Sequence, residues 1–263
     1  MSERITIGQY LTGDSFLHRL DPRVKIFLTI VFMVCIFLVS SYWGYAVFLG
    51  FVLLCMIVGE VPPKQLFKGL RPIFLILLFT FAINLLTTPG ELLFEVWVLR
   101  VTQEGLHKAV FIAIRIVLLV LGTSLLTLTT SPLSLTDGME ALMKPLTLVR
   151  FPAHELAMMI SIALRFIPTL FDESDKIMRA QKARGADFES GNLFQRARAM
   201  IPLMVPLFLN AFRRAEELGT AMEARCYRGG AGRTRLNPLR MALADWMTFG
   251  LTSASLLATA WIF

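Results

Sequence analysis

The chain is poor in charge and in the residues that usually carry chemistry. Only 17% of its 263 residues are charged and 56% are hydrophobic, whereas a soluble domain has about a quarter charged residues. Three cysteines and three histidines occur. Cys35, Cys55 and Cys226 lie far apart without metal-ligand spacing, which disfavours both a zinc site and a disulfide framework. This composition predicts a polytopic membrane protein.

Sequence motifs for catalysis are also missing. The chain has no G-x-x-x-x-G-K-[ST] sequence, so we expect it to bind no ATP through a P-loop. His154 and Glu155 begin a zinc-protease motif, but Met158 occupies the position of the second histidine. No carboxylate lies in the middle of an apolar run, which disfavours a proton or ion relay. We therefore expect a non-catalytic subunit with no metal, and no channel or transporter that acts alone.

The chain does contain five long apolar runs, where a bilayer-spanning helix needs about 20 residues. They cover residues 24–41, 44–58, 72–88, 106–130 and 241–263.

Arg115 is the exceptional charge within the apolar runs. We expect a structural role for Arg115, in which it pairs with a carboxylate or reaches towards an interface, because a charge in a membrane needs a partner.

Loop charges predict the orientation of these runs. Lys and Arg are concentrated before the first run, between the second and third, and between the fourth and fifth. The loop at residues 41–44 is uncharged, and the loop at 89–105 is mainly acidic. Since positive residues stay in the cytoplasm, we expect a cytoplasmic N-terminus and an extracytoplasmic C-terminus. The net charge of +7 then indicates cytoplasmic loops and a partner surface, with no nucleic acid as a partner.

The segment 131–240 is too charged to span the membrane as a whole and too apolar for an ordinary loop. It begins with a short helix near residues 135–146. Apolar residues at i, i+3 and i+4 then predict two long amphipathic helices, at about 153–184 and 192–225. Each would be roughly 50 Å long.

Proline residues modify these two helices. We expect Pro168 to kink the first helix, and Pro202 with Pro206 to bend the second. The predicted fold is an all-α polytopic membrane protein with about five transmembrane helices plus two long kinked amphipathic helices on the cytoplasmic side. The predicted organisation is residues 1–130 with four spans, residues 131–240 at the inner leaflet and cytoplasm, and residues 241–263 as the last span.

Both long helices end in a small-arginine-small pattern, Ala183-Arg184-Gly185 and Ala224-Arg225-Cys226. One interpretation is helix termination, because a cation suits the C-terminal end of the dipole and Gly185 can adopt a left-handed conformation. The other is docking, in which small neighbours let the tip enter a groove and the guanidinium makes planar contacts. Two tips would suit a dimeric partner with two similar grooves.

Three stretches carry a resemblance to a known family. Residues 8–26, 163–188 and 215–235 are similar to the opening and the two coupling helices of the transmembrane T component of energy-coupling factor (ECF) transporters, which are ABC-type importers of vitamins and metal ions. The resemblance covers nearly the whole chain. It implies that the motifs centred on Arg184 and Arg225 dock into two ATPase subunits. Cys226 departs from the family, which often has glycine at this position.

The resemblance also implies a second partner, a small membrane-embedded substrate-binding S component. The apolar faces of the two long helices would form its platform. It further implies that ATP and magnesium are bound by the ATPases, and that the chain lies in a bacterial or archaeal cell membrane. Methionines give a soft surface that accepts several partners, although the same stripe could pack against neighbouring spans. The candidate platform residues are Met159, Ile160, Met200, Met204 and Phe208.

Two alternative functions remain. In a membrane-embedded enzyme with a cytoplasmic active site, Asp172, Glu173 and Asp175 would be catalytic or metal-binding. The favoured interpretation is a solvated helix face, with Asp172 paired to Lys176 and Asp175 paired to Arg179. A conventional ABC permease subunit would form the substrate path itself, but it would use a short coupling helix in a loop and not two helices of about 50 Å.

Overall fold

The computed structural model describes residues 10–96, 99–149, 151–188, 192–229, 239 and 241–263. The described residues are helical apart from one two-stranded hairpin and the connecting turns, so the predicted all-α polytopic fold is confirmed. The chain forms two compact units. We call residues 8–142 with 237–263 the bundle unit, and residues 143–236 the helix-pair unit.

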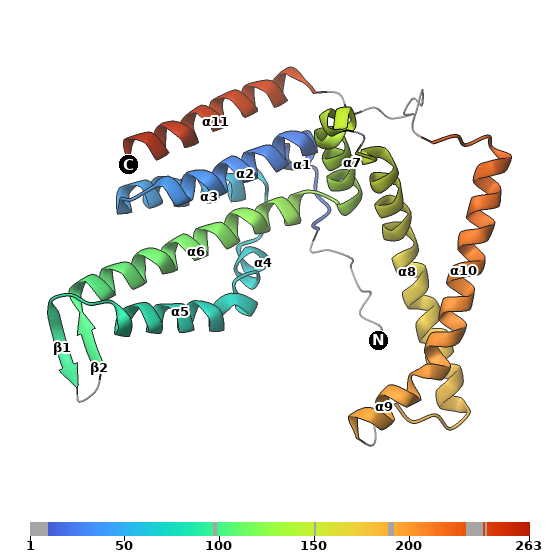
Figure 1. Cartoon of the computed structure of the whole chain (residues 1–263). Helices are drawn as coiled ribbons and strands as arrows, with labels where there is room; N and C mark the ends of the chain where they lie inside the picture. Colours follow the sequence, from blue (N-terminus) through green and yellow to red (C-terminus); the bar gives the residue numbers. More distant parts are fainter. Residues whose placement is uncertain (1–9, 97–98, 150, 189–191, 230–238, 240) are drawn as a thin grey trace. The chain divides into compact units, whose positions relative to one another are not determined.

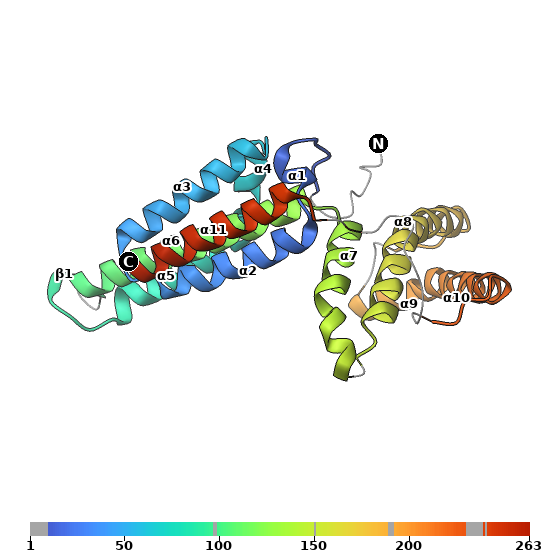
Figure 2. The same cartoon turned by 90° about the horizontal axis from the view of Figure 1, so that it is seen from above.

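The bundle unit consists of apolar helices that lie side by side (Figures 1 and 2). The central helix, α6, contacts α2, α3, α4 and α5, and α11 lies against α2. A short 3-10 turn, η1, joins α4 to α5. The elements are α1 (Phe16–Arg19), α2 (Pro22–Leu38), α3 (Tyr42–Val58), α4 (Pro63–Lys68), η1 (Arg71–Ile73), α5 (Phe74–Thr87), α6 (Gln103–Thr129), α7 (Pro132–Met143) and α11 (Leu243–Ile262).

Each of the five apolar runs forms a helix near its predicted bounds, as α2, α3, α5, α6 and α11. By length and composition, three continuous helical stretches of the described residues suffice to cross a membrane: Pro63–Thr87, Gln103–Thr129 and Ala153–Ala183. The third stretch is the first of the long amphipathic helices. The sequence instead predicts a position at the inner leaflet and cytoplasm for this helix.

Capping residues mark the starts of α2 and α6. Asp21 precedes α2, and its Oδ1 accepts a hydrogen bond from the Arg23 N–H at 2.8 Å, while Pro22 occupies the first turn. Thr102 precedes α6, and its Oγ1 accepts from the Gly105 N–H at 3.0 Å. Such side chains bond the amides that a helix start leaves unpaired, and proline loses nothing there.

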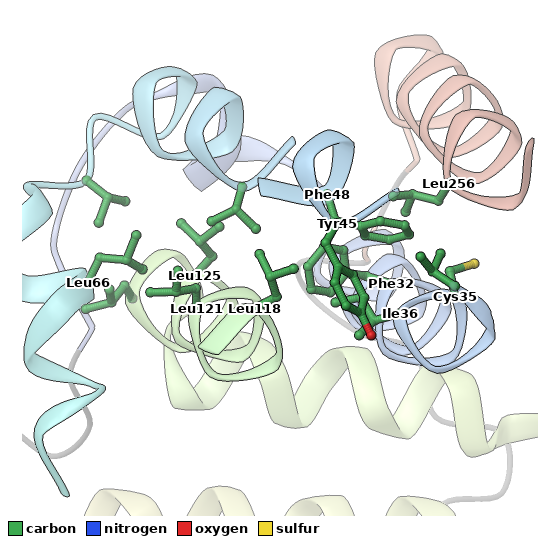
Figure 3. Packing of buried hydrophobic residues seen from close by; sticks show 14 residues of the cluster. Phe32, Cys35, Ile36, Tyr45, Phe48, Leu66, Leu118, Leu121, Leu125 and Leu256 are labelled. Atoms are coloured by element: carbon green, nitrogen blue, oxygen red, sulfur yellow. The ribbon is translucent and has the colours of Figure 1, made fainter. Parts of the chain in front are cut away.

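The core of the bundle unit lies where α2, α3, α6 and α11 meet (Figure 3). Phe32 and Phe48 pack with ring centroids 5.4 Å apart, and Leu118 and Leu256 are buried beside them. Gly122 of α6 lies against Phe32, where a Cβ atom would come within 2.3 Å of the ring. The absent side chain therefore lets α2 and α6 approach closely, as small residues do in membrane helix packing.

An antiparallel hairpin follows α5, although the sequence indicated only a loop there. Strand β1 (Leu92–Val96) pairs with β2 (Leu99–Thr102), and the register sets Val96 opposite Leu99. The stretch is rich in aromatic and β-branched residues, which favour extended backbone.

The helix-pair unit contains η2 (Lys144–Val149), α8 (Ala153–Ala183), α9 (Leu193–Ala199) and α10 (Ile201–Ala224). The first long helix has nearly its predicted bounds and carries Pro168 in its interior. The prediction of one continuous second helix was wrong, because it breaks at Met200 into α9 and α10. Pro202 explains the break, since its ring would clash inside a helix but fits the first turn of a new one. Pro206 lies within α10.

Candidate functional site

The tip of α8 is a tight C-terminal turn centred on Arg184. Gly185 adopts a left-handed conformation with φ of +87°, as the sequence predicted. The Gly185 N–H donates to the Lys182 carbonyl at 3.0 Å, and the Ala186 N–H donates to the Gln181 carbonyl at 3.0 Å. This pair of bonds is the Schellman motif, which satisfies carbonyls that a helix end leaves unpaired.

The tip of α10 repeats this geometry around Arg225. The Cys226 N–H donates to the Glu223 carbonyl at 2.9 Å, and the Tyr227 N–H donates to the Met222 carbonyl at 3.0 Å. Cys226 takes the left-handed position with φ of +58°. A residue with a Cβ atom is strained in this conformation, so the fold imposes at Cys226 the turn that Gly185 makes without strain.

Both tips present small residues around an exposed arginine. Ala183, Arg184 and Gly185 are all exposed, and so are the three equivalent residues of α10. A Cβ atom added at Gly185 would meet nothing within 4 Å. A guanidinium on such a slender end can enter a groove and donate several hydrogen bonds in one plane.

The candidate platform residues stay exposed in this structure. Within the described part of the helix-pair unit, the buried residues are Ala153, Ala157 and Leu203. The apolar stripes of α8 and α10 are therefore not buried by packing within the helix-pair unit. The exposed fractions are 53% for Met159, 38% for Ile160, 48% for Met200, 46% for Met204 and 55% for Phe208.

The acidic residues considered for catalysis do not converge on one point. Asp172 and Asp175 are exposed, whereas Glu173 is largely buried and faces α10. Its Oε1 accepts from Asn210 Nδ2 at 2.6 Å, and its Oε2 lies 3.5 Å from Arg214 Nη2. The described residues contain no group of three or more His, Cys, Asp or Glu able to hold a metal. The geometry gives Glu173 a structural contact that the sequence analysis missed. The one available signal was an asparagine, Asn210, in an apolar stretch.

The two ion pairs expected along α8 are not formed. Among the described residues, no ion pair joins Asp172 to Lys176 or Asp175 to Arg179. All four side chains are exposed, and exposed pairs of this kind gain little free energy from closing.

Arg115 has neutral partners in the bundle unit. Its Nε donates to the Tyr45 hydroxyl at 2.8 Å and its Nη2 donates to the Val39 carbonyl at 3.4 Å. Its guanidinium also lies over the rings of Phe37 and Phe111, at 5.4 and 5.3 Å. Of the two expected alternatives, a carboxylate partner is not found among the described residues, and the structural role is supported, because these contacts tie the end of α2 to α3 and α6.

At the opposite end of α2, Lys25 connects the start of α2 to the ends of α1 and α6. Its buried Nζ donates to the Thr129 carbonyl at 3.0 Å, the His18 carbonyl at 3.3 Å and the Thr130 hydroxyl at 3.3 Å. The ammonium thus uses its three donors, and it meets the negative ends of α1 and α6.

Asp245 ties the start of the last helix to the same place. Its Oδ1 accepts from the Asp21 N–H at 3.0 Å, and its Oδ2 accepts from the Ala242 N–H at 2.7 Å. At the far end of the bundle, the Ser40 N–H donates to the Phe263 carbonyl at 3.1 Å. The starts of α2 and α11 therefore share one end of the bundle unit and their ends share the other.

Comparison with known proteins decides the family. The family model described as CbiQ, cobalt transport protein, matches residues 13–236. A protein of Thermosediminibacter oceani is 55% identical over 245 residues, which are 93% of this chain and 92% of the relative. A protein of Clostridium kluyveri is 52% identical over 267 residues, which cover 99% of each chain. Both relatives are named energy-coupling factor transporter transmembrane protein EcfT. The chain belongs to the EcfT family.

Membership confirms the resemblance carried by the coupling-helix stretches. A third relative, from Ruminiclostridium cellulolyticum, is 50% identical over 252 residues, which are 96% of this chain and 94% of the relative. The EcfT-family chain is a transmembrane component of an ECF-type transporter and a multi-pass cell-membrane protein, in agreement with its apolar helices.

Proposed function

We propose that this EcfT-family chain is the energy-coupling subunit of an ECF-type ABC importer of vitamins or metal ions. It transmits ATP-driven motion from two ATPase subunits to a substrate-binding S component. The observation that carries the proposal is the duplication of one tip geometry, since Arg184 and Arg225 each stand on an exposed Schellman turn.

The course of α8 and α10 supports docking to two separate grooves. The two helices contact each other and run in opposite directions, so their C-terminal tips point apart (Figure 1). A single compact groove could not receive both tips. Two ATPase subunits with similar grooves would take one arginine each, through contacts of the guanidinium with carboxylates or carbonyls.

The S component would rest on the exposed apolar stripes of the same two helices. Met159 and Ile160 belong to α8, Met204 and Phe208 to α10, and Met200 directly precedes α10. When ATP binding or hydrolysis moves the grooves, the tips move with them. The stripes are displaced in consequence, and the S component is reoriented or released. Flexible thioethers can maintain contact while this surface moves.

The chemistry of ATP belongs to the partners in this proposal. The chain lacks a P-loop, so the ATPases would bind ATP and magnesium and this subunit would be non-catalytic. The N-terminus and the arginine tips would lie in the cytoplasm, and the C-terminus outside a bacterial or archaeal membrane. The loop charges support this orientation.

Arginine substitutions test the proposal directly. We expect Arg184→Ala or Arg225→Ala to weaken ATPase binding by at least about tenfold, as truncation of a desolvated charged contact does. Uptake should fall with each change and most with both. Copurification of two ABC ATPases and uptake into cells are the measurements.

Arg179→Ala is the matched control, because Arg179 is an exposed arginine of α8 outside the tip. It should leave both measurements unchanged. Full ATPase copurification with full uptake in the doubly substituted protein would contradict the proposal.

A further inference from the structure

The contact between α8 and α10 contains a polar group that tip docking does not use. Glu173 of α8 accepts a hydrogen bond from Asn210 Nδ2 at 2.6 Å, and its other oxygen lies 3.5 Å from Arg214 Nη2. Asn210 and Arg214 are spaced i, i+4, so they share one face of α10. One carboxylate of α8 thus holds two side chains of the other helix.

Burial makes this contact sensitive to geometry. The Glu173 side chain is 19% exposed, and its Oε2 is shielded from solvent. A carboxylate withdrawn from water is unfavourable unless charged or hydrogen-bonding groups face it. Asn210 meets that need for Oε1 through a short, directional hydrogen bond, whereas Oε2 forms no hydrogen bond and lies 3.5 Å from the partly exposed Arg214 guanidinium.

Few of the described residues in the helix-pair unit are fully buried. Ala153, Ala157 and Leu203 are the buried residues in the described part of the helix-pair unit, and only Leu203 belongs to α10. Apolar contact is non-directional and allows helices to slide and rotate. The contact of Glu173 with Asn210 and Arg214 therefore adds a directional constraint to the place where α8 crosses α10.

We propose that Glu173, Asn210 and Arg214 form a polar clasp that serves as the pivot between the two coupling helices. The inference rests on the proposed coupling function. By helix rise, Glu173 lies roughly 16 Å from Arg184, and Asn210 lies roughly 22 Å from Arg225. Each tip is thus the end of a lever arm that starts at the clasp.

The clasp couples movement of one tip to movement of the other helix. With the clasp closed, a displacement of either arginine turns its helix about a fixed point and moves the apolar stripes together. With the clasp broken, the helices slip past each other and ATP is hydrolysed without productive movement. Glu173 is in this sense a positioning residue, and its loss should uncouple hydrolysis from uptake.

Distance measurement in the complete transporter tests the pivot. Spin labels at Ala180 and Glu217, both exposed, would report the relative position of the two arms in a background with the native cysteines replaced. We expect Glu173→Ala to broaden the distance distribution and to lower uptake per ATP hydrolysed by at least about fivefold. The ATPases should still copurify. Asp172→Ala, at the exposed neighbouring position, is the matched control and should change neither measurement.

Exchange of the charged partners separates positioning from general damage. Glu173→Arg and Arg214→Glu should each broaden the distribution, and the two together should narrow it and recover uptake. Should Glu173→Ala not be obtained from the membrane, Asn210→Ala and the exchanged pair decide the matter in the same assays. A narrow distribution with normal uptake in Glu173→Ala would overturn the clasp, and so would loss of the ATPases from that variant, which would indicate a role in folding alone.

The clasp and the docking proposal fail in different ways. Arginine-tip variants that keep their ATPases and their uptake contradict docking, whatever Glu173 does. Tip variants that lose the ATPases, together with normal coupling in Glu173→Ala, contradict only the clasp.

Discussion

At the scale of single residues, the two tips differ in one conformational detail. Gly185 and Cys226 occupy equivalent left-handed positions, but only glycine adopts them without a steric penalty. Gly229 and Gly230 are the nearest glycines after Arg225 in the sequence, but the structure places the turn at Cys226, three residues before Gly229. The left-handed residue must directly follow Arg225, because only then can the next two N–H groups reach the carbonyls of Glu223 and Met222.

Substitution at Cys226 should stabilise the α10 tip. We expect Cys226→Gly to stabilise the last turn by about 1 kcal/mol, since the Cβ clash is removed. Amide hydrogen exchange of the peptide that contains Tyr227 should slow by roughly fivefold.

The complementary change at Gly185 should have the opposite effect on α8, with exchange about fivefold faster in Gly185→Ala. Cys226→Ala is the control, because it keeps a Cβ atom in the left-handed position and should leave exchange unchanged. Equal exchange in Cys226→Gly and Cys226→Ala would refute the assignment of strain.

At the scale of elements, helix ends are held by buried polar groups and not by apolar packing alone. Lys25 joins the ends of α1 and α6 to the start of α2, and Asp245 joins α11 to the same place. Where α2 ends, Arg115 of α6 joins the Val39 carbonyl to Tyr45 of α3. These contacts lie where neighbouring helices must stay in register, and each satisfies backbone groups that the helices leave unpaired.

Loss of the Lys25 ammonium should destabilise the bundle unit. Lys25→Met leaves the Thr129 and His18 carbonyls without this donor, and we expect a loss of about 2–4 kcal/mol. The thermal unfolding midpoint of the detergent-purified protein is the measurement.

Lys68→Met is a suitable control, since Lys68 is exposed at the end of α4. If Lys25→Met unfolds at the same midpoint as the unchanged protein, water replaces the ammonium without loss of stability and the prediction is wrong.

At the scale of the whole molecule, the bundle unit relates the two chain ends to the membrane. The five predicted spans would place the ends of α2 and α11 on the same side of the membrane, and the hydrogen bond between Ser40 and Phe263 agrees with this. The helix-pair unit carries the arginine tips, and its basic residues predict a cytoplasmic location for them.

Labelling of single cysteines tests this orientation. In a background without native cysteines, a membrane-impermeant maleimide should label Trp43→Cys in intact cells and Lys68→Cys only after permeabilisation. Both positions are exposed in the structure, so accessibility to the reagent depends on the side of the membrane. The reverse pattern would invert the topology.

Much of this organisation could be predicted from sequence because it depends on local patterns. Apolar runs gave the five bundle helices, and i, i+4 periodicity gave α8. Local patterns were less informative where two tendencies compete. In residues 192–225 the apolar residues keep helical spacing across Pro202, which predicts one helix. The backbone shows instead that the helix is interrupted at Met200.

The sequence by itself determined that this is a polytopic membrane protein of the EcfT family with two arginine tips, because hydropathy, loop charge and motif are properties of neighbouring residues. The tertiary structure alone decided which polar groups meet. Lys25 contacts a residue 104 positions away, Asp245 contacts one 224 positions away, and Glu173 contacts one 37 positions away. Such pairs join residues that no local pattern connects, so they meet only when the helices pack against one another.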